Sequence, residues 1–182
     1  MKKITIFNFC LAVIIGTFSN ISFANDKKVG IFYDERFLLH DTGPNHPENP
    51  ERLIPVIRDL KNNDHISSNT IWPNFEAATV EELNLVHTKE YIELVDRQVS
   101  QLNNSRAYLS TGDTPISKHT NLVAKLAVGA GLEAADQIMA GKISTAFALV
   151  RPPGHHATAS MGMGFCVYNS VAVVARYLQK KI

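Results

Sequence analysis

The sequence contains few cysteines: Cys10 and Cys166 are the two among its 182 residues. Cys10 lies in an apolar segment near the start of the chain. If that segment is removed, one cysteine remains and no internal disulfide can form. A lone cysteine beside an aromatic residue, as Cys166 is beside Phe165, is typical of a packed core position. The sequence therefore excludes a small fold held together by disulfides.

The sequence also lacks a strong charge of either sign. It has 18 basic and 17 acidic residues, a formal net charge of +1, and 45% hydrophobic residues, an ordinary globular balance. This charge predicts no attraction to nucleic acid or to an anionic membrane surface. There is no internal repeat, low-complexity tract or interdomain linker, so one domain is predicted.

The one apolar run that is long enough to interact with a membrane lies before residue 25. Lys2 and Lys3 are followed by a mainly apolar run over residues 4–18 and then by Ser22-Phe23-Ala24. The run is shorter than the ~20 residues of a spanning helix, and its small-x-small ending fits a cleavage site. We predict a signal peptide over residues 1–24 and an exported chain, periplasmic or secreted, with no stable membrane association after cleavage. An uncleaved N-terminal anchor is the alternative.

The remaining sequence alternates between strand and helix patterns. We expect strands over 29–34, 70–74 and 144–150, and helices over 50–60, 79–87, 89–101, 118–140 and 170–181. Residues 144–150 carry no charge and predict a central strand buried on both faces. Residues 171–175 are so apolar that we expect both sides of their helix to be covered. The order of helix, strand, loop and helix predicts a doubly wound parallel α/β fold.

Two signals are specific to single helices. Thr79 and Glu82 form a capping-box pattern. The helix predicted over 118–140 has an apolar stripe at steps of three and four residues, and Gly141 follows it at the position that commonly ends a helix. Its stripe is made mainly of alanines, which predicts a crossover helix lying close on the sheet: Val123, Ala127, Ala130, Ala134 and Ile138.

The stretch RPPGHH, residues 151–156, follows the predicted strand 144–150. Ligands of doubly wound sheets bind at the carboxyl ends of the strands. Two prolines restrict the backbone and Gly154 permits a turn, so we expect His155 and His156 on a stiff loop. Adjacent side chains on such a loop diverge, which favours proton transfer by imidazole over joint metal ligation. Solvent-exposed or structural histidines are the alternative.

The segments RPPGHHA (151–157) and MGFCVYNSVAVVARYL (163–178) resemble the zinc-dependent histone deacetylase superfamily, which includes bacterial deacetylase-like amidohydrolases and acetylpolyamine amidohydrolases. HPENPERL (46–53), VHTKEYIELV (86–95) and DTPIS (113–117) support the resemblance. It implies an arginase/deacetylase α/β fold and hydrolysis of an acyl-amide by zinc-bound water. The implied substrates are acetyl-lysine or acetylpolyamine-like compounds.

The resemblance also implies roles for single residues. His156 matches the general base that later acts as general acid, and His155 matches its electrostatic partner. Gly164 and Phe165 match residues that line the acyl-lysine tunnel. Arg52 matches an arginine of an internal channel in some members, with a surface helix arginine as the alternative. Arg151 is expected to be a structural, ion-paired arginine.

The zinc ligands of the family are absent from this sequence. The family takes them from an Asp-x-His on the next strand and from a later aspartate, and the chain contains no Asp-x-His. A catalytic zinc site needs three protein ligands, and His40, Asp41 and His46 lie in the wrong loop to supply them. We therefore predict no metal site within this chain and expect the zinc ligands beyond Ile182.

On this interpretation, residues 25–182 form the N-terminal part of the domain, truncated after about half of it. The chain alone is then expected to be inactive and to expose apolar surface. Two other hypotheses remain open: a non-catalytic binding product, and one half of a split enzyme that a second chain completes.

Overall fold

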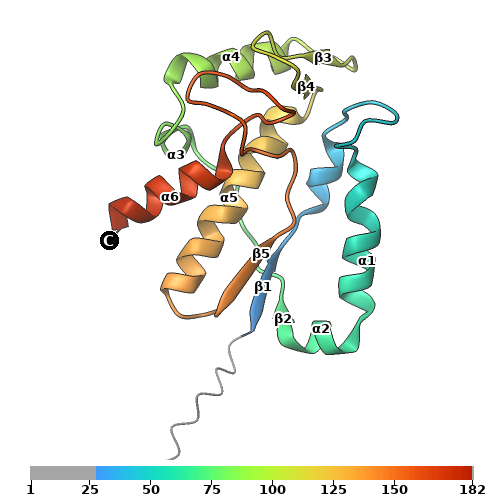
Figure 1. Cartoon of the computed structure of the whole chain (residues 1–182), viewed down its shortest axis with the longest axis vertical. Helices are drawn as coiled ribbons and strands as arrows, with labels where there is room; N and C mark the ends of the chain where they lie inside the picture. Colours follow the sequence, from blue (N-terminus) through green and yellow to red (C-terminus); the bar gives the residue numbers. More distant parts are fainter. Residues whose placement is uncertain (1–27, 182) are drawn as a thin grey trace, which may run out of the picture.

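The structure is a computed structural model that describes residues 28–181 (Figure 1). The predicted signal peptide and Cys10 lie outside these residues. The core of the fold is a parallel sheet of three strands in the order β2-β1-β5, formed by Thr70–Ile71, Val29–Phe32 and Thr145–Ala148. Strand β1 is central: Gly30 pairs with Ile71 on one side and with Ala146 on the other. The predicted parallel α/β fold is confirmed.

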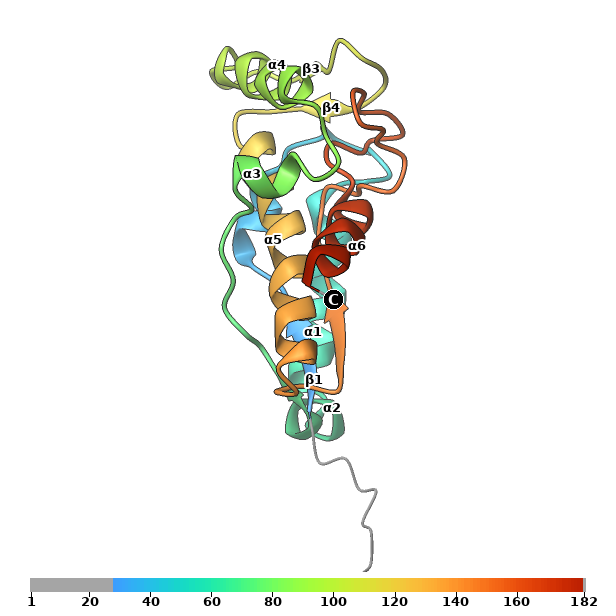
Figure 2. The ribbon, with the colours of Figure 1, turned by 90° about the vertical axis from the view of Figure 1, so that its left-hand side faces the viewer.

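Helices cover both faces of this sheet (Figures 1 and 2). Helix α5, Thr120–Met139, packs on the face that carries Phe32. Helix α1, Ile54–Asn62, packs on the opposite face, where Ile57 contacts Ile31 and Leu149. Helix α6, Ser170–Lys181, lies against α5. Coverage of both faces is the doubly wound arrangement that the sequence predicts.

The smaller elements surround this core. Two 3-10 helices, η1 and η2, span Glu35–Leu39 and Pro50–Leu53. Helices α2, α3 and α4 span Asp64–Asn69, Val80–Leu83 and Lys89–Ser100. Strands β3 and β4, Ala107–Tyr108 and Pro115–Ile116, form an antiparallel pair. No helix of the described chain is both long and apolar enough to cross a membrane.

The helix predicted over 50–60 is divided in the structure. The Asn49 side chain accepts a hydrogen bond from the Arg52 amide and begins the 3-10 turn η2. The α-helix α1 then starts with Pro55 in its first turn. Proline is tolerated there because the N–H that it lacks would have no acceptor within the helix. The capping box of Thr79 and Glu82 is confirmed, although the helix that it opens is the short α3.

Helix α5 ends as predicted. Gly141 has a φ of 66°, its amide donates to the Ile138 carbonyl, and the Lys142 amide donates to the Gln137 carbonyl. These bonds form a Schellman motif, for which glycine is favoured because of the positive φ. The predicted stripe is buried at Val123 and at its three alanines. Ile138 is the exception: it lies in the last turn and its side chain is exposed.

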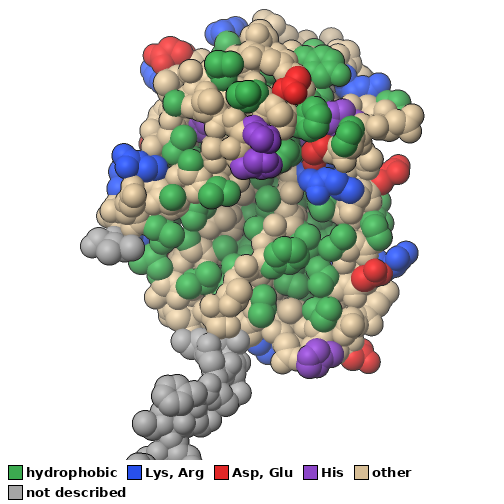
Figure 3. All heavy atoms as spheres, viewed as in Figure 1, with side chains coloured by type: hydrophobic (Ala, Val, Ile, Leu, Met, Phe, Trp, Pro, Cys, Tyr) green, Lys and Arg blue, Asp and Glu red, His purple; other side chains and the backbone are tan. Residues whose placement is uncertain are grey.

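Burial of residues 144–150 and 171–175 on both sides is not found, and apolar surface is exposed there, as expected for the chain alone. Strand β5 covers only residues 145–148 and pairs only with β1 among the described strands, so Phe147 is 51% exposed. Helix α6 buries one face, at Val173, and leaves Val171 exposed, because α5 packs against it from one side. Figure 3 shows apolar side chains gathered between α1 and α6, over the sheet. A run without charge predicts burial only where neighbouring elements cover it.

Two glycines of α5 offer a matched test of this packing. A Cβ at Gly129 would lie 1.9 Å from the Glu76 carbonyl oxygen, whereas a Cβ at Gly131 would meet only a side-chain methyl of Val174, at 2.8 Å, on the neighbouring helix α6. Gly129→Ala is expected to lower the free energy of unfolding by about 1–3 kcal/mol, because backbone must move. Gly131→Ala should stay within about 1 kcal/mol of the parent, since alanine favours the helix. Urea denaturation measures both, and equal stability of the variants would contradict this packing.

Candidate active site

The loop that carries the tandem histidines is held tightly from its start. Arg151 and Pro152 are buried, and a Cβ at Gly154 would lie 2.2 Å from the Tyr168 carbonyl oxygen. The Ala157 amide donates to the Gly154 carbonyl at 3.1 Å and closes a turn around the histidines. Gly154 is therefore needed for the close approach of two backbone segments. These contacts are consistent with the stiff loop that the prolines predict.

The far side of the loop is fixed by buried polar groups. The Asn169 side chain donates to the Ala157 carbonyl at 2.9 Å, and the Asn169 amide donates to Nε2 of His87, also at 2.9 Å. His87 is buried, and burial lowers the pKa of its imidazole. The neutral ring that accepts this bond is consistent with that direction. These contacts place the start of α6 against the turn that carries the histidines.

His155 and His156 lie side by side on the surface of this turn. Their ring centroids are 4.2 Å apart and both side chains are exposed, so the expected divergence of these adjacent side chains is wrong. The His156 amide donates to the Cys166 thiol at 3.4 Å, which ties the pair to the segment that follows. Two accessible imidazoles on a fixed backbone can accept and return a proton.

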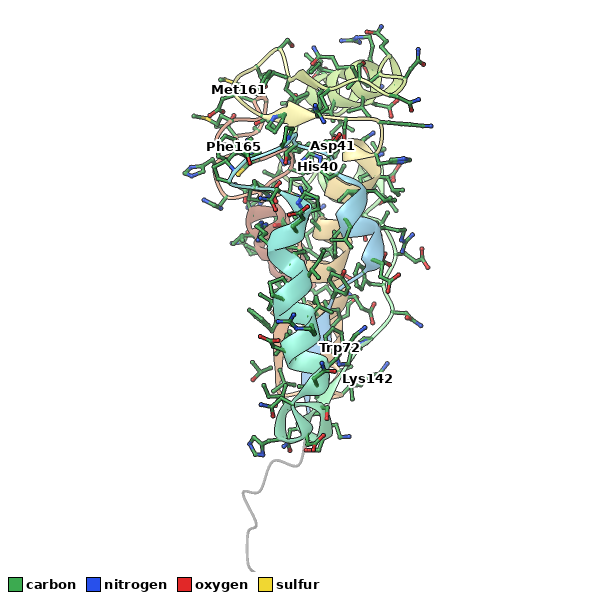
Figure 4. All side chains as sticks on the ribbon, turned by 90° about the vertical axis from the view of Figure 1, so that its right-hand side faces the viewer. His40, Asp41, Trp72, Lys142, Met161 and Phe165 are labelled. Atoms are coloured by element: carbon green, nitrogen blue, oxygen red, sulfur yellow. The ribbon has the colours of Figure 1, made fainter. Side chains whose placement is uncertain are left out.

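Gly164 and Phe165 lie next to this pair, as the sequence predicts for residues of one site. A Cβ at Gly164 would lie 2.7 Å from Cδ2 of His156, so the glycine allows the ring to rest on the backbone. Phe165 follows with a φ of 66° and meets the His46 ring edge-on at a centroid distance of 4.5 Å. In Figure 4, Phe165 and Met161 lie on the same side of the molecule.

Two residues of this region were not predicted to belong to the site. An oxygen of Asp113 accepts a hydrogen bond from the Gly164 amide at 2.6 Å. His46 contacts Phe165, although the sequence places it more than 100 positions away. Asp113 belongs to the DTPIS segment and His46 to HPENPERL, so the resemblance marked both segments. It did not indicate which side chain of each would reach the site.

Cys166 is a core residue, as predicted. It is fully buried, and its thiol donates to the Gly164 carbonyl at 3.4 Å. Burial raises the pKa of the thiol, which keeps it protonated at neutral pH. Cys166 therefore supports the backbone of the site and has no nucleophilic character.

Arg151 is the ion-paired structural residue that the sequence predicts. Its guanidinium is fully buried and makes five hydrogen bonds. Two go to the Glu48 carboxylate at 3.0 Å each, and the others go to the carbonyls of Phe37, His40 and Glu48. Every N–H of the guanidinium therefore has an acceptor, the condition under which a buried charge is tolerated.

Arg52 contacts the Glu48 carboxylate from the solvent side. Its guanidinium donates to Glu48 at 2.9 Å, and its side chain is 39% exposed. The structure thus places Arg52 beside the Arg151–Glu48 pair. The role in an internal channel stays a prediction.

His40, Asp41 and His46 contact other groups in the structure. His40 is buried, its Nδ1 lies 2.8 Å from the Thr120 hydroxyl, and burial together with Arg151 lowers its pKa to about 3. Asp41 pairs instead with Arg106 at 2.8 Å. Figure 4 shows His40 and Asp41 near the top of the molecule, to the right of Phe165. Over residues 28–181, no three His, Cys, Asp or Glu side chains form a group that could hold a metal.

Comparison with known proteins identifies the family. The model of the histone deacetylase domain matches residues 46–182. The chain belongs to this family. Its match includes the tandem histidines, Gly164, Phe165 and the Arg151–Glu48 pair, which confirms the resemblance inferred from the motifs.

Relatives and a solved structure agree with the histone deacetylase family. Histone deacetylase 5 of Arabidopsis thaliana is 38% identical over 166 residues, which cover 84% of this chain and 24% of that protein. The human polyamine deacetylase HDAC10 is 35% identical over 147 residues, covering 79% of this chain and 22% of that protein. The crystal structure of the HDA15 HD domain has a TM-score of 0.77 and 34% identity, covering 85% of this chain and 44% of that one. The chain thus spans less than half the length of these relatives.

Proposed function

We propose that this chain is the N-terminal part of a zinc-dependent deacetylase that hydrolyses acetyl-lysine or acetylpolyamine-like substrates. The observation that carries the proposal is the pair of exposed imidazoles, 4.2 Å apart, beside Gly164 and Phe165 at the carboxyl end of a parallel strand. The family match supports the deacetylase class, and one relative is named a polyamine deacetylase. A small acyl-amide or an acylated lysine is therefore the proposed substrate.

In the proposed reaction, His156 removes a proton from the attacking water and later returns a proton to the leaving amine. His155 lies close enough to stabilise the charge that develops on its neighbour. Gly164 lies against His156 and Phe165 lies against His46, and both residues would line the path of the acyl-lysine chain. The contact of Phe165 with His46 and the Asp113 bond to the Gly164 amide hold this wall in place.

Zinc belongs to this proposal through the family alone. The described residues do not fit the metal, because they contain no group of three suitable ligands. We propose that the ligands come from a polypeptide segment outside residues 28–181. The exposed edge of β5 and the exposed Phe147 are consistent with a further strand on that side.

Three sources of the zinc ligands remain to be distinguished: further codons of the same or an interrupted reading frame, a separate chain that completes a split enzyme, and none, in which case the product acts only by binding. An Asp-x-His encoded in frame or in another frame shortly after codon 182 favours the first source. The same motif behind a separate start codon favours the split enzyme, and its absence favours the binding product.

We also propose export after cleavage at Ala24, which N-terminal sequencing of the mature protein would test.

The purified chain and a chimera together test the proposed function. The chain alone should hold no stoichiometric zinc and release no acetate from acetyl-lysine peptides or acetylated polyamines. A chimera in which residues 46–181 replace the matching part of the HDA15 HD domain should bind zinc and release acetate. Tight equimolar zinc in the chain alone would contradict the proposed location of the ligands. A folded, zinc-loaded chimera without acetate release would contradict the deacetylase function.

A further inference from the structure

Glu48 is a buried carboxylate shared by two arginines. Its side chain is 7% exposed. Arg151 approaches it with two parallel hydrogen bonds of 3.0 Å, and Arg52 adds a third of 2.9 Å. Parallel N–H bonds of this kind fix direction as well as distance. The carboxylate therefore holds the two arginines in one geometry.

The Arg151 bonds connect two distant parts of the chain. Arg151 lies four positions before His155, at the start of the tandem-histidine loop. Its remaining bonds go to the carbonyls of Phe37, His40 and Glu48, which belong to the segment between β1 and α1. The Arg151–Glu48 ion pair thus joins the segment that follows β5 to the segment that follows β1, across 103 positions of sequence.

The same segment supports the wall of the site. His46 contacts Phe165, and its Nδ1 accepts a hydrogen bond from the Glu48 amide at 3.0 Å. The Asn49 side chain donates to the His46 carbonyl at 2.9 Å. Glu48 is therefore linked to the histidine loop through its carboxylate and to Phe165 through its backbone.

The surroundings leave Glu48 few other partners. Among the described residues, the charged or titratable groups near the carboxylate are Arg151, Arg52, the buried Cys166 thiol and His40, whose Nε2 lies 3.7 Å from Oε2. His40 is buried and neutral at ordinary pH, because its pKa lies near 3. Removing the negative charge of Glu48 would leave the buried Arg151 without a counter-ion.

We propose that Glu48 is a positioning residue that sets the His155–His156 pair and the Phe165 wall in a common geometry by holding Arg151, while Arg52 is an outer partner that this geometry does not require. The functional meaning of this clamp rests on the proposed function, since it concerns the residues assigned to proton transfer and to the tunnel. The clamp itself is a structural link that can be measured without any activity.

The test compares Glu48→Gln with Arg52→Gln in the full chain. Glu48→Gln keeps the shape of the side chain and removes its charge, and Arg52→Gln removes only the half-exposed partner. In Glu48→Gln, amide hydrogen exchange over 154–157 and 164–166 should accelerate about tenfold more than exchange in α4 and α5, which reports any general loss of stability. Nuclear Overhauser contacts between the His155 and His156 rings, and between His46 and Phe165, should weaken together. In Arg52→Gln, all of these signals should persist.

Each outcome decides the proposal. Unchanged exchange and ring contacts in a folded Glu48→Gln would overturn it. Uniformly faster exchange that includes α4 would also overturn it, because Glu48 would then stabilise the whole fold and not this site. If Glu48→Gln does not fold, Glu48→Asp, which keeps the charge on a shorter side chain, replaces it under the same criteria. Because none of these measurements uses catalysis, an inactive chimera would count against the proposed function and leave the clamp intact.

Discussion

Replacing Arg151 with methionine is expected to lower the free energy of unfolding by about 3–5 kcal/mol, the cost of leaving one partner of a buried ion pair unpaired. Methionine fills a similar volume but donates no hydrogen bond. Glu48 would keep a buried charge that only the half-exposed Arg52 compensates, and the carbonyls of Phe37 and His40 would lose their donor. Since a small domain has only about 5–15 kcal/mol of stability, this single change could unfold it.

Urea denaturation of the Arg151→Met and Arg106→Met variants measures this effect. Arg106 also forms a 2.8 Å ion pair with a carboxylate, that of Asp41, but its side chain is 47% exposed. Its replacement should cost no more than about 1 kcal/mol, because water screens an exposed pair. If both variants lost equal stability, burial would not be the reason for the importance of Arg151.

Replacing His156 with asparagine in the HDA15 chimera is expected to lower kcat/KM for an acetyl-lysine peptide by about 10²–10⁴-fold, the usual contribution of a general acid–base residue. Asparagine keeps polarity and much of the size of the ring but cannot take up a proton near neutral pH. The side chain is exposed, so the fold should tolerate the change. The loss should therefore appear in the rate of the chemical step.

The control for this variant is His65→Asn. His65 is also exposed but lies on α2, at the end of the sheet opposite the tandem-histidine loop, and should leave kcat/KM unchanged (Figure 1). Steady-state kinetics and the zinc content of both variants are compared at equal concentration of folded protein. A His156→Asn chimera that keeps its zinc and more than about a tenth of the parent rate would refute the assignment of His156 as the proton carrier.

Some features of the fold could be predicted because their signals are local. The capping box of Thr79 and Glu82 and the Schellman end at Gly141 involve residues within one turn of helix. The stiffness of the RPPGHH loop follows from the restricted backbone of proline. Burial was harder to predict, because strand β5 and helix α6 are covered only where another element reaches them, and Phe147 and Val171 are exposed.

By itself, the sequence determined the family, the place of the tandem histidines after a parallel strand, and the absence of an Asp-x-His. These follow from residue types at short spacing. Only the tertiary structure decided that Glu48 pairs with Arg151 across 103 positions and that His46 rests on Phe165. Such contacts depend on which strands end next to each other at one edge of the sheet. They also depend on whether each buried hydrogen-bond donor has an acceptor. Neither condition can be read from spacing along the chain.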